Sequence, residues 1–259
     1  MHQASANIDW TKPWFQPYQA HGDCVSHLWG ERDHLYQALA LHGAAPVVFV
    51  SHHELPEGEP YESFILRTGQ CPTRDNLHDL FNALAWLKFP VSKARFNELQ
   101  AAQIEAGALK HRGPVRDAIT VFDENGALLH APEPIWEALV ARDWRRLFID
   151  LRPLWGQAHL LIFGHALLEK LVTPRKPLTA HVWRVPSPHR TPEGVDRWLA
   201  AQLEPGVLAA KPFTPLPLMG IPGWCAENQN FSFYDDSLVF RPGRLKNDIT
   251  TGPPTALRP

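Results

Sequence analysis

The stretch 75–100, DNLHDLFNALAWLKFPVSKARFNELQ, decides the fold because its pattern predicts two consecutive helices. The first is expected over 75–87, where apolar side chains repeat at the spacing of one helix face: Leu77, Leu80, Phe81, Leu84 and Ala85. Pro90 ends this helix, because proline lacks the backbone N–H that a helix interior needs. A second helix is expected over 92–106.

Outward from this pair, the chain predicts short strands and further helices. Strands are expected over 46–51, 178–185 and 231–240. Helices are expected over 29–42, 134–148 and 157–172, and over 192–203, where Thr191-Pro192-Glu193 is a typical helix start. A hairpin is expected over 118–130, because Asn125 and Gly126 form the dipeptide typical of a tight hairpin turn. Residues 205–217 are proline-rich and are expected to be irregular.

These elements do not alternate regularly between strand and helix, so the sequence predicts the α+β class. We expect a single globular domain over 1–259, with several helices around a small, mostly antiparallel sheet and long Pro-rich irregular segments. Residues 1–25 are expected to form an irregular N-terminal arm and residues 241–259 a loose C-terminal tail. The chain has 25 prolines among 259 residues, about twice the ordinary share, which explains the irregular segments.

Composition excludes several classes of protein. The net charge of −2 argues against bulk nucleic-acid binding. Three cysteines without a metal-binding spacing, and no secretory signal, predict a cytoplasmic protein. The segment 153–168 lacks charged residues but is shorter than a membrane span, so no membrane-spanning helix is expected. The chain contains no GxGxxG, P-loop, HExxH or GxSxG motif.

The first candidate site lies at the start of the helix predicted over 75–87. His78 and Asn82 are four residues apart and share a helix face, and Asp79 lies beside them. A helix N-terminus attracts anions, and Arg74 and Lys93 add positive charge nearby. The alternative is a capped helix face that only contacts solvent.

The second candidate is the pair His165 and Glu169, whose spacing lets both side chains reach one divalent metal ion. Two ligands hold a catalytic metal poorly, so His78 or Asp79 would have to supply a third. The alternative is a core histidine whose hydrogen-bonding need is met by Glu169 itself.

Two weaker candidates follow. Arg116 and Asp117 precede an acidic turn over 123–126, and together they could bind a hard cation. Turn formation alone explains the acidic turn, and the alternative for Arg116 and Asp117 is a buried ion pair. Trp224 lies in a Pro/Gly loop near Tyr234-Asp235-Asp236 and could form a pocket wall or a packed structural loop.

The longest motifs resemble a bacterial family of domains of unknown function, the family numbered 3025. They are CPTRDNLHDLFNALAWLKFPVSKARFNELQ (71–100), RGPVRDAITVFDENG (112–126), FGHALLEKL (163–171), PLPLMGIPGW (215–224) and FYDD (233–236). The resemblance covers about 47–242. It implies no particular reaction, since that family has none assigned, but it implies that these polar motifs converge in space.

Two hypotheses follow. In the first, the protein is a metal-dependent hydrolase acting on a phosphoester or another anionic substrate. His78, His165 and Glu169 would bind a divalent metal ion and Asp117 or Asp79 would act in catalysis. The substrate would be bound by five residues: Arg74, Asn82, Lys93, Arg116 and Trp224.

In the second, the protein is a non-catalytic ligand- or protein-binding domain whose polar clusters are buried structural networks. An enzyme that stacks single-stranded nucleic acid on Trp86, Trp183 or Trp224 is a third possibility, which the near-neutral charge disfavours. The sequence leaves the oligomeric state open.

Overall fold

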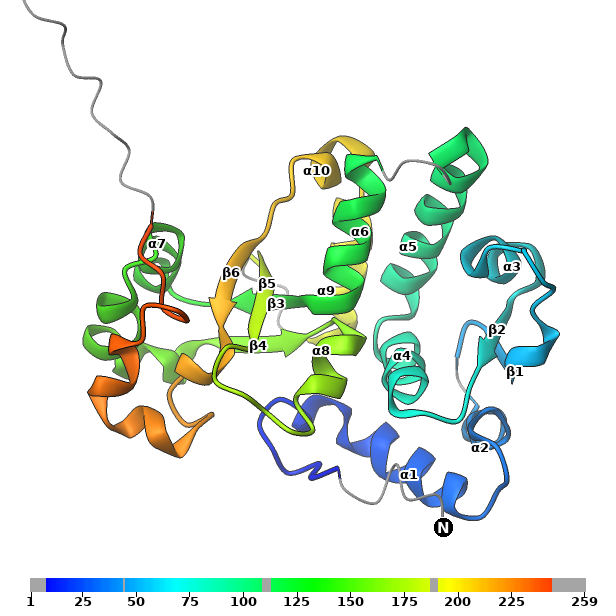
Figure 1. Ribbon diagram of the computed structural model, residues 1–259, viewed down its shortest axis with the longest axis horizontal. Coiled ribbons are helices and arrows are strands. Elements are labelled where there is room, and N and C mark those ends of the chain that lie inside the picture. The colour runs from blue at the N-terminus through cyan, green and yellow to red at the C-terminus, as the bar shows by residue number, and fades with distance from the viewer. Residues whose placement is uncertain (1–7, 44, 109–112, 187–190, 244–259) are drawn as a thin grey trace, which may run out of the picture.

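A computed structural model describes residues 8–43, 45–108, 113–186 and 191–243. Two small sheets lie on opposite sides of a central group of helices (Figure 1). This group contains α4 (Leu77–Lys88), α5 (Pro90–Gln103) and α6 (Pro114–Asn125). The mixture of helices and small sheets confirms the predicted α+β class.

The larger sheet has four strands in the order β4-β3-β5-β6. Its strands are β3 (Gly126–His130), β4 (His159–Ile162), β5 (Thr179–Arg184) and β6 (Thr214–Pro217). β3 pairs antiparallel with β4 and parallel with β5, and β5 pairs antiparallel with β6. Two of the three pairings are antiparallel, as the sequence predicts for this sheet.

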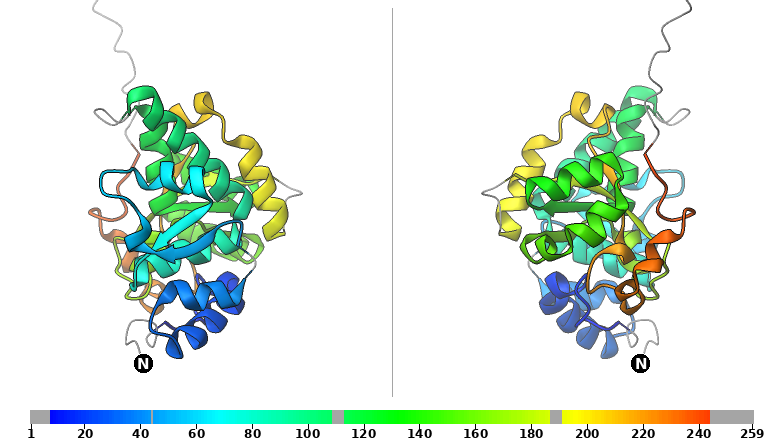
Figure 2. Two further views of the ribbon diagram at one scale, coloured as in Figure 1. Left: turned by 90° about the vertical axis from the view of Figure 1, so that its right-hand side faces the viewer. Right: turned by 90° about the vertical axis from the view of Figure 1, so that its left-hand side faces the viewer.

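The smaller sheet pairs β1 (Val48–Ser51) with β2 (Gln70–Thr73) in parallel. The crossover between them contains α3 (Tyr61–Thr68). In Figure 2, left, this pair lies in front, with α1 and α2 beneath it. β2 leads directly into the start of α4, so this sheet positions the first candidate site.

Other helices complete the two sides of the molecule: α1 (Gln19–Gly30), α2 (Leu35–His42), α7 (Glu133–Ala141), α8 (His165–Lys170), α9 (Pro192–Gln202) and α10 (Pro205–Ala209). Asp196 on α9 accepts hydrogen bonds from the backbone N–H groups of Val91 (3.0 Å) and Ser92 (2.8 Å). These groups begin α5 and have no partner within that helix. This contact therefore joins α9 to the helical pair.

The helical pair agrees with the prediction from 75–100, and β1 and β5 agree with two of the expected strands. The hairpin over 118–130 is wrong. Residues Pro114–Asn125 form α6, and Asn125-Gly126 joins this helix to β3. Ala118, Ile119 and Phe122 are buried at helical spacing, so packing of this face outweighs the local turn signal of Asn-Gly.

The single helix predicted over 157–172 is also wrong. Its first part is strand β4, which pairs with β3, and its second part is the short helix α8. The continuous apolar run fits a buried strand as well as a buried helix, so periodicity alone does not separate them.

Other boundaries differ from the prediction. The range 29–42 contains the end of α1 and all of α2, and α7 ends at Ala141, before a separate turn of π-helix at Arg146–Asp150. Residues 205–217 form α10 and β6. The predicted strand over 231–240 is instead a 3-10 helix, η8 (Phe231–Asp235), followed by a loop.

The predicted arm and tail lie partly outside the described residues, which begin at Ile8 and end at Gly243. Within the arm, α1 already begins at Gln19, so residues 1–25 are not wholly irregular. Trp10, Trp14 and Phe15 pack against the body, as their apolar character requires.

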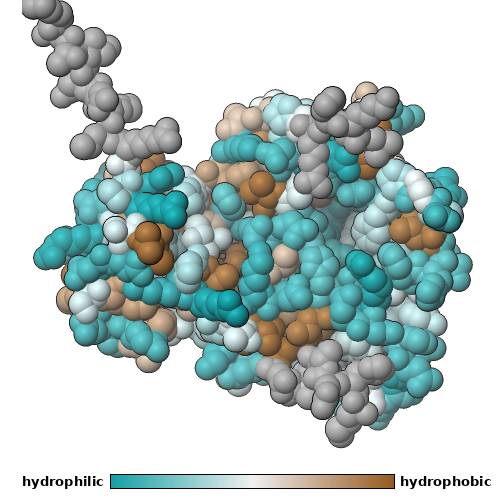
Figure 3. All heavy atoms as spheres, in the orientation of Figure 1, coloured by the Kyte–Doolittle hydropathy of each residue, from teal (hydrophilic) through white to brown (hydrophobic). Residues whose placement is uncertain are grey.

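One connected cluster of buried apolar side chains runs from Ile8 to Phe240 and includes residues from both sides of the molecule. The face of the molecule shown in Figure 3 is mostly hydrophilic, with hydrophobic residues in small separate groups. No helix in the described part of the chain has the length and apolar character that a membrane crossing needs.

Candidate functional site

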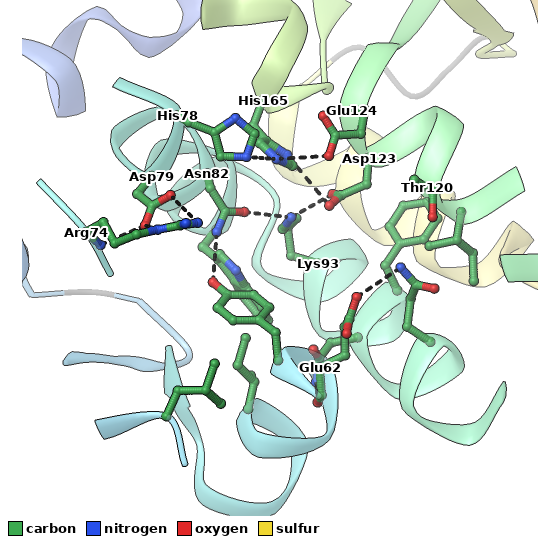
Figure 4. A pocket seen from close by; sticks show the side chains of 18 of the residues that line it. Glu62, Arg74, His78, Asp79, Asn82, Lys93, Thr120, Asp123, Glu124 and His165 are labelled. Carbon is green, nitrogen blue, oxygen red and sulfur yellow. Dashed lines mark hydrogen bonds and ion pairs between the residues drawn. The ribbon is translucent and has the colours of Figure 1, made fainter. Parts of the chain in front are cut away.

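A cavity of about 320 Å³ lies among α3, α4, α5, α6 and α8, with His52 and Leu55 at its wall. Its polar lining comes from segments far apart in the sequence (Figure 4). The labelled residues are Glu62, Arg74, His78, Asp79, Asn82, Lys93, Thr120, Asp123, Glu124 and His165. Four of them are carboxylates and two are permanent cations, so the cavity concentrates ionisable groups as functional sites do.

The start of α4 positions three of these side chains. Asn76 is the N-cap, and its side chain accepts a hydrogen bond from the backbone N–H of Asp79 (2.8 Å). The Asp79 carboxylate in turn accepts from the backbone N–H of Arg74 (2.7 Å). This reciprocal cap fixes the first turn of α4, from which His78 and Asn82 face the cavity.

Two histidines meet at one edge of the cavity. Nε2 of His78 lies 3.1 Å from Nε2 of His165, and Nε2 of His165 lies 3.7 Å from Oε1 of Glu124. One ligand atom from each of the three residues lies within 4.8 Å of the others. Bonds of about 2.0–2.2 Å to one metal ion place tetrahedral ligand atoms about 3.3–3.5 Å apart. These three residues could therefore hold a metal ion.

Each histidine faces a carboxylate with its other ring nitrogen. Nδ1 of His78 lies 3.1 Å from Oε2 of Glu169, and Nδ1 of His165 lies 3.6 Å from Oδ2 of Asp123. A carboxylate that accepts the Nδ1 proton leaves the Nε2 lone pair available for a metal. Metal-binding histidines in proteins commonly have such a partner.

Gly164 brings His165 close to the acidic end of α6. A Cβ atom at Gly164 would lie 2.5 Å from the carbonyl oxygen of Glu124 and 2.6 Å from the backbone nitrogen of Asn125. Only glycine allows this approach. The next residue, His165, consequently lies beside Asp123 and Glu124, although about forty residues of sequence separate them.

A second set of contacts extends inward from the histidines. Nζ of Lys93 donates to Asp123 (2.6 Å) and to Asn82 (3.0 Å), and the Asn82 amide donates to the Tyr61 hydroxyl (3.2 Å). The Tyr61 hydroxyl lies 3.1 Å from Sγ of Cys71. This buried network therefore joins α3, α4, α5 and α6 around the cavity.

Burial determines the protonation of several groups. It lowers the pKa of His165 to about 4, although Asp123 opposes the shift, so His165 is neutral near pH 7. Burial would raise the pKa of Asp123, but the Lys93 ammonium opposes it and the net pKa lies below the ordinary value. Burial and the charge of Asp123 raise the pKa of Glu124. Burial also raises the pKa of the Cys71 thiol to about 11, so this cysteine is no thiolate nucleophile.

The structure brings together six of the residues expected from the sequence: Arg74, His78, Asp79, Asn82, Lys93 and His165 line the cavity. Asp79 holds the Arg74 guanidinium at the rim (3.2 Å). Glu169 lies on the far side of His78, at Nδ1, and is not one of the three residues that converge on one point.

The remaining three expected residues lie elsewhere. Asp117 forms an ion pair with Lys211 (2.5 Å), and neither Asp117 nor its neighbour Arg116 lines the cavity. Trp224 packs against Trp14, with ring centroids 5.3 Å apart, and lines a different cavity.

The sequence indicates Asp123 and Glu124 only as part of an acidic turn that could bind a hard cation, and the predicted hairpin does not bring them to His78 and His165. The signal that could have found them is the burial spacing of Ala118, Ile119 and Phe122. Extended by one helical turn, that spacing places both carboxylates at the end of a helix.

Fold and site together define an α+β protein with a candidate metal site of two histidines and a carboxylate. The chain matches the model of the family described as "Protein of unknown function (DUF3025)" over residues 47–244, and it belongs to this family. The matched range contains every residue of the cavity described above. Comparison with the curated proteins gave no match, and comparison with the solved structures gave none.

Proposed function

We propose that this protein is a metal-dependent hydrolase acting on a phosphoester or another anionic substrate, with His78, His165 and Glu124 as metal ligands. The observation that carries the proposal is the approach of the two Nε2 atoms to 3.1 Å, with a carboxylate oxygen 3.7 Å from one of them. Three protein ligands leave a fourth position open, as in catalytic rather than structural zinc sites. A divalent cation held by these residues would supply the chemistry of a Lewis acid, making water a stronger nucleophile near pH 7.

The other cavity residues have separate roles in this proposal. Glu169 orients the imidazole ring of His78 through Nδ1, and the Asp123 carboxylate faces Nδ1 of His165 at 3.6 Å, beyond hydrogen-bond distance. Lys93 has three N–H donors, of which Asp123 and Asn82 take two, so the third would contact an anionic oxygen of the substrate. Arg74 has a side chain 56% exposed and would bind the substrate at the rim. The proposal gives no role to Asp117, Arg116 or Trp224.

Exposure separates this proposal from the alternative of a non-catalytic binding domain. The side chains of His78 and Glu124 are each 36% exposed, so a ligand can reach them from the cavity. The side chains of Lys93 and His165 are only 5% and 7% exposed. The buried side chains of Lys93 and His165 resemble a structural network, which the alternative expects. The side chains of His78 and Glu124 have the access to solvent that catalysis requires.

The first test is metal content by mass spectrometry on protein purified without chelators or a His-tag. We expect near-stoichiometric zinc or another divalent metal in the wild type and less than a tenth of it in folded His78→Ala. The matched control is His53→Ala, which removes an exposed histidine that lies outside the cavity. Absence of metal from the wild type, both as purified and after dialysis against zinc, would reject the metal site.

The second test is hydrolysis of p-nitrophenyl phosphate, bis(p-nitrophenyl) phosphate and p-nitrophenyl acetate by the metal-loaded protein. The proposal expects turnover of a phosphoester that His78→Ala loses at least 100-fold. Stoichiometric metal without turnover of any phosphoester would contradict the hydrolase and leave a metal-binding domain.

A further inference from the structure

A second cavity, of about 510 Å³, lies against β3 and β4 of the larger sheet. Its walls come from β3 and β4, from η5 (Arg152–Gln157), from the N-terminal residues 13–17 and from the loop 221–224. The volume falls within the range of about 300–1,000 Å³ that small-molecule sites occupy. None of its lining residues lines the cavity of the candidate metal site.

The lining is mostly apolar, with Gln16, His130, His159 and Arg152 as its polar side chains, and contains no acidic side chain among the described residues. Trp155 and Trp224 contribute ring surfaces, and Leu128, Leu160 and Leu161 contribute aliphatic ones. Nε1 of Trp155 donates to the carbonyl oxygen of Leu147 (2.9 Å), so the N–H donor of this ring already has an acceptor. A ligand with an apolar body would bury these surfaces without loss of a polar contact.

Arg152 is the permanently charged residue of this lining. In the described structure its guanidinium pairs with no carboxylate. It donates to the carbonyls of Phe148 (3.4 Å) and Asn228 (3.4 Å), the Tyr234 hydroxyl (3.2 Å) and the Asn228 side chain (3.1 Å), and it lies over the Phe231 ring, 5.8 Å from the centroid. Nη1 makes three of these hydrogen bonds and Nη2 one. Since a guanidinium has five N–H donors, Nε–H and one Nη2 proton remain for a ligand.

From this lining we infer that the second cavity binds a small organic anion, namely a carboxylate on an aromatic or aliphatic body. The apolar walls hold the body, and the partly buried Arg152 binds the carboxylate through its remaining donors. A charge-assisted hydrogen bond in such surroundings is stronger than one between neutral groups. This site is independent of the proposed hydrolase, because it uses none of that site's residues.

The experiment measures binding by calorimetry to the full chain, treated with chelator so that metal at the other cavity cannot bind the probe. The probes are 2-naphthoate and octanoate, with 2-naphthalenemethanol as the neutral counterpart of the first. We expect at least one carboxylate to bind, and 2-naphthalenemethanol to bind at least tenfold more weakly than 2-naphthoate. No binding of either carboxylate, or equal binding of 2-naphthoate and its alcohol, would overturn the inference.

Location is tested by filling the cavity rather than by removing Arg152, which also holds Asn228 and Tyr234 in place. Gly156 lines the cavity, and a Cβ atom there would meet no other atom within 4 Å, so Gly156→Leu adds bulk without backbone strain. The matched control is Gly206→Leu, an equally open glycine on α10 outside the cavity. We expect Gly156→Leu to weaken carboxylate binding at least fivefold and Gly206→Leu to leave it unchanged. Equal binding by both variants would place the probe elsewhere and reject the site.

Discussion

At the scale of single residues, the candidate metal site depends on which nitrogen of each histidine faces which carboxylate. His78 and His165 direct Nε2 toward one point and Nδ1 toward Glu169 and Asp123. Glu124 is the carboxylate on the Nε2 side. In the proposed function, two glutamates near the same histidines would therefore have different roles, Glu124 as ligand and Glu169 as orienting group.

This difference predicts unequal effects of two similar substitutions. Glu124→Gln removes a charged ligand, and we expect zinc affinity to fall at least 100-fold. Glu169→Gln keeps an acceptor for the Nδ1 proton of His78, so the expected loss is about 10-fold and no more than 100-fold. Competition titration against a chromophoric chelator measures both. The reverse order would make Glu169 the ligand and Glu124 the accessory group.

A histidine pair in the N-terminal region predicts a pH dependence of stability. Nδ1 of His21 on α1 lies 3.2 Å from Nε2 of His42 at the end of α2. Burial, with His42 and Lys88 nearby, lowers the pKa of His21 below its ordinary value. The unfolded chain then takes up the proton at higher pH than the folded one, so stability falls as the pH drops below about 6.5.

We therefore expect His21→Gln to lose less stability than the wild type between pH 7.5 and pH 5.5, measured by urea denaturation. The control is His27→Gln on the same helix, because the side chain of His27 is 77% exposed. Equal pH slopes for all three proteins would show that His21 has an ordinary pKa.

At the scale of elements, the end of α6 and the start of α8 form the acidic side of the site. The backbone N–H groups of Phe163 and Gly164 donate to the carbonyl oxygen of Gly126 (2.9 Å each), which fixes α8 against this junction. The approach is close enough that a side chain at Gly164 would collide with the backbone of Glu124 and Asn125. The geometry of the ligands thus depends on a contact between two backbones.

Gly164→Ala is expected to lower the free energy of unfolding by about 1–3 kcal/mol, because an added methyl group in a packed contact forces the backbone apart. The same shift moves His165 away from Glu124, so zinc affinity falls as well. Gly156→Ala is the control, since its Cβ meets no atom within 4 Å. Unchanged stability and zinc affinity in Gly164→Ala would mean that the two elements do not need this close contact.

At the scale of the whole molecule, the three proposed ligands come from α4, α6 and α8, and Glu169 follows on α8. The intervening stretches include β3, α7 and β4, so the ligands meet only when the larger sheet has formed. A metal ion would bind the folded chain and not the unfolded one, and would stabilise it by mass action.

Free zinc at 100 times its dissociation constant should add about 2.7 kcal/mol to the free energy of unfolding. For a chain of this length, that corresponds to a rise in Tm of about 5–10 °C. Scanning calorimetry of the wild type and of Glu124→Gln with and without zinc measures the effect. An equal rise in both proteins would show that zinc binds outside the proposed ligands.

The sequence by itself determined the α+β class, the two helices over 75–100, the short strands β1 and β5, and membership of the family. These features follow from local signals: apolar spacing along one helix face, a proline between two helices, and short β-branched runs. Five expected residues of the site come from the stretch 74–93, which forms the start of α4 and of the adjacent α5, and they line one cavity. The sixth, His165, reaches this cavity from α8 only through the tertiary fold.

Only the tertiary structure decided the rest, because the deciding contacts join segments far apart in the chain. The run over 157–172 becomes a strand where β3 pairs with it and a helix where it does not. Asn125-Gly126 ends a helix and makes no hairpin, because burial of Phe122 and its neighbours stabilises α6 over a local turn. Glu124, and not Glu169, converges with His78 and His165 on the candidate metal site, because Gly164 packs closely on the end of α6. Residue spacing in the sequence cannot predict this contact.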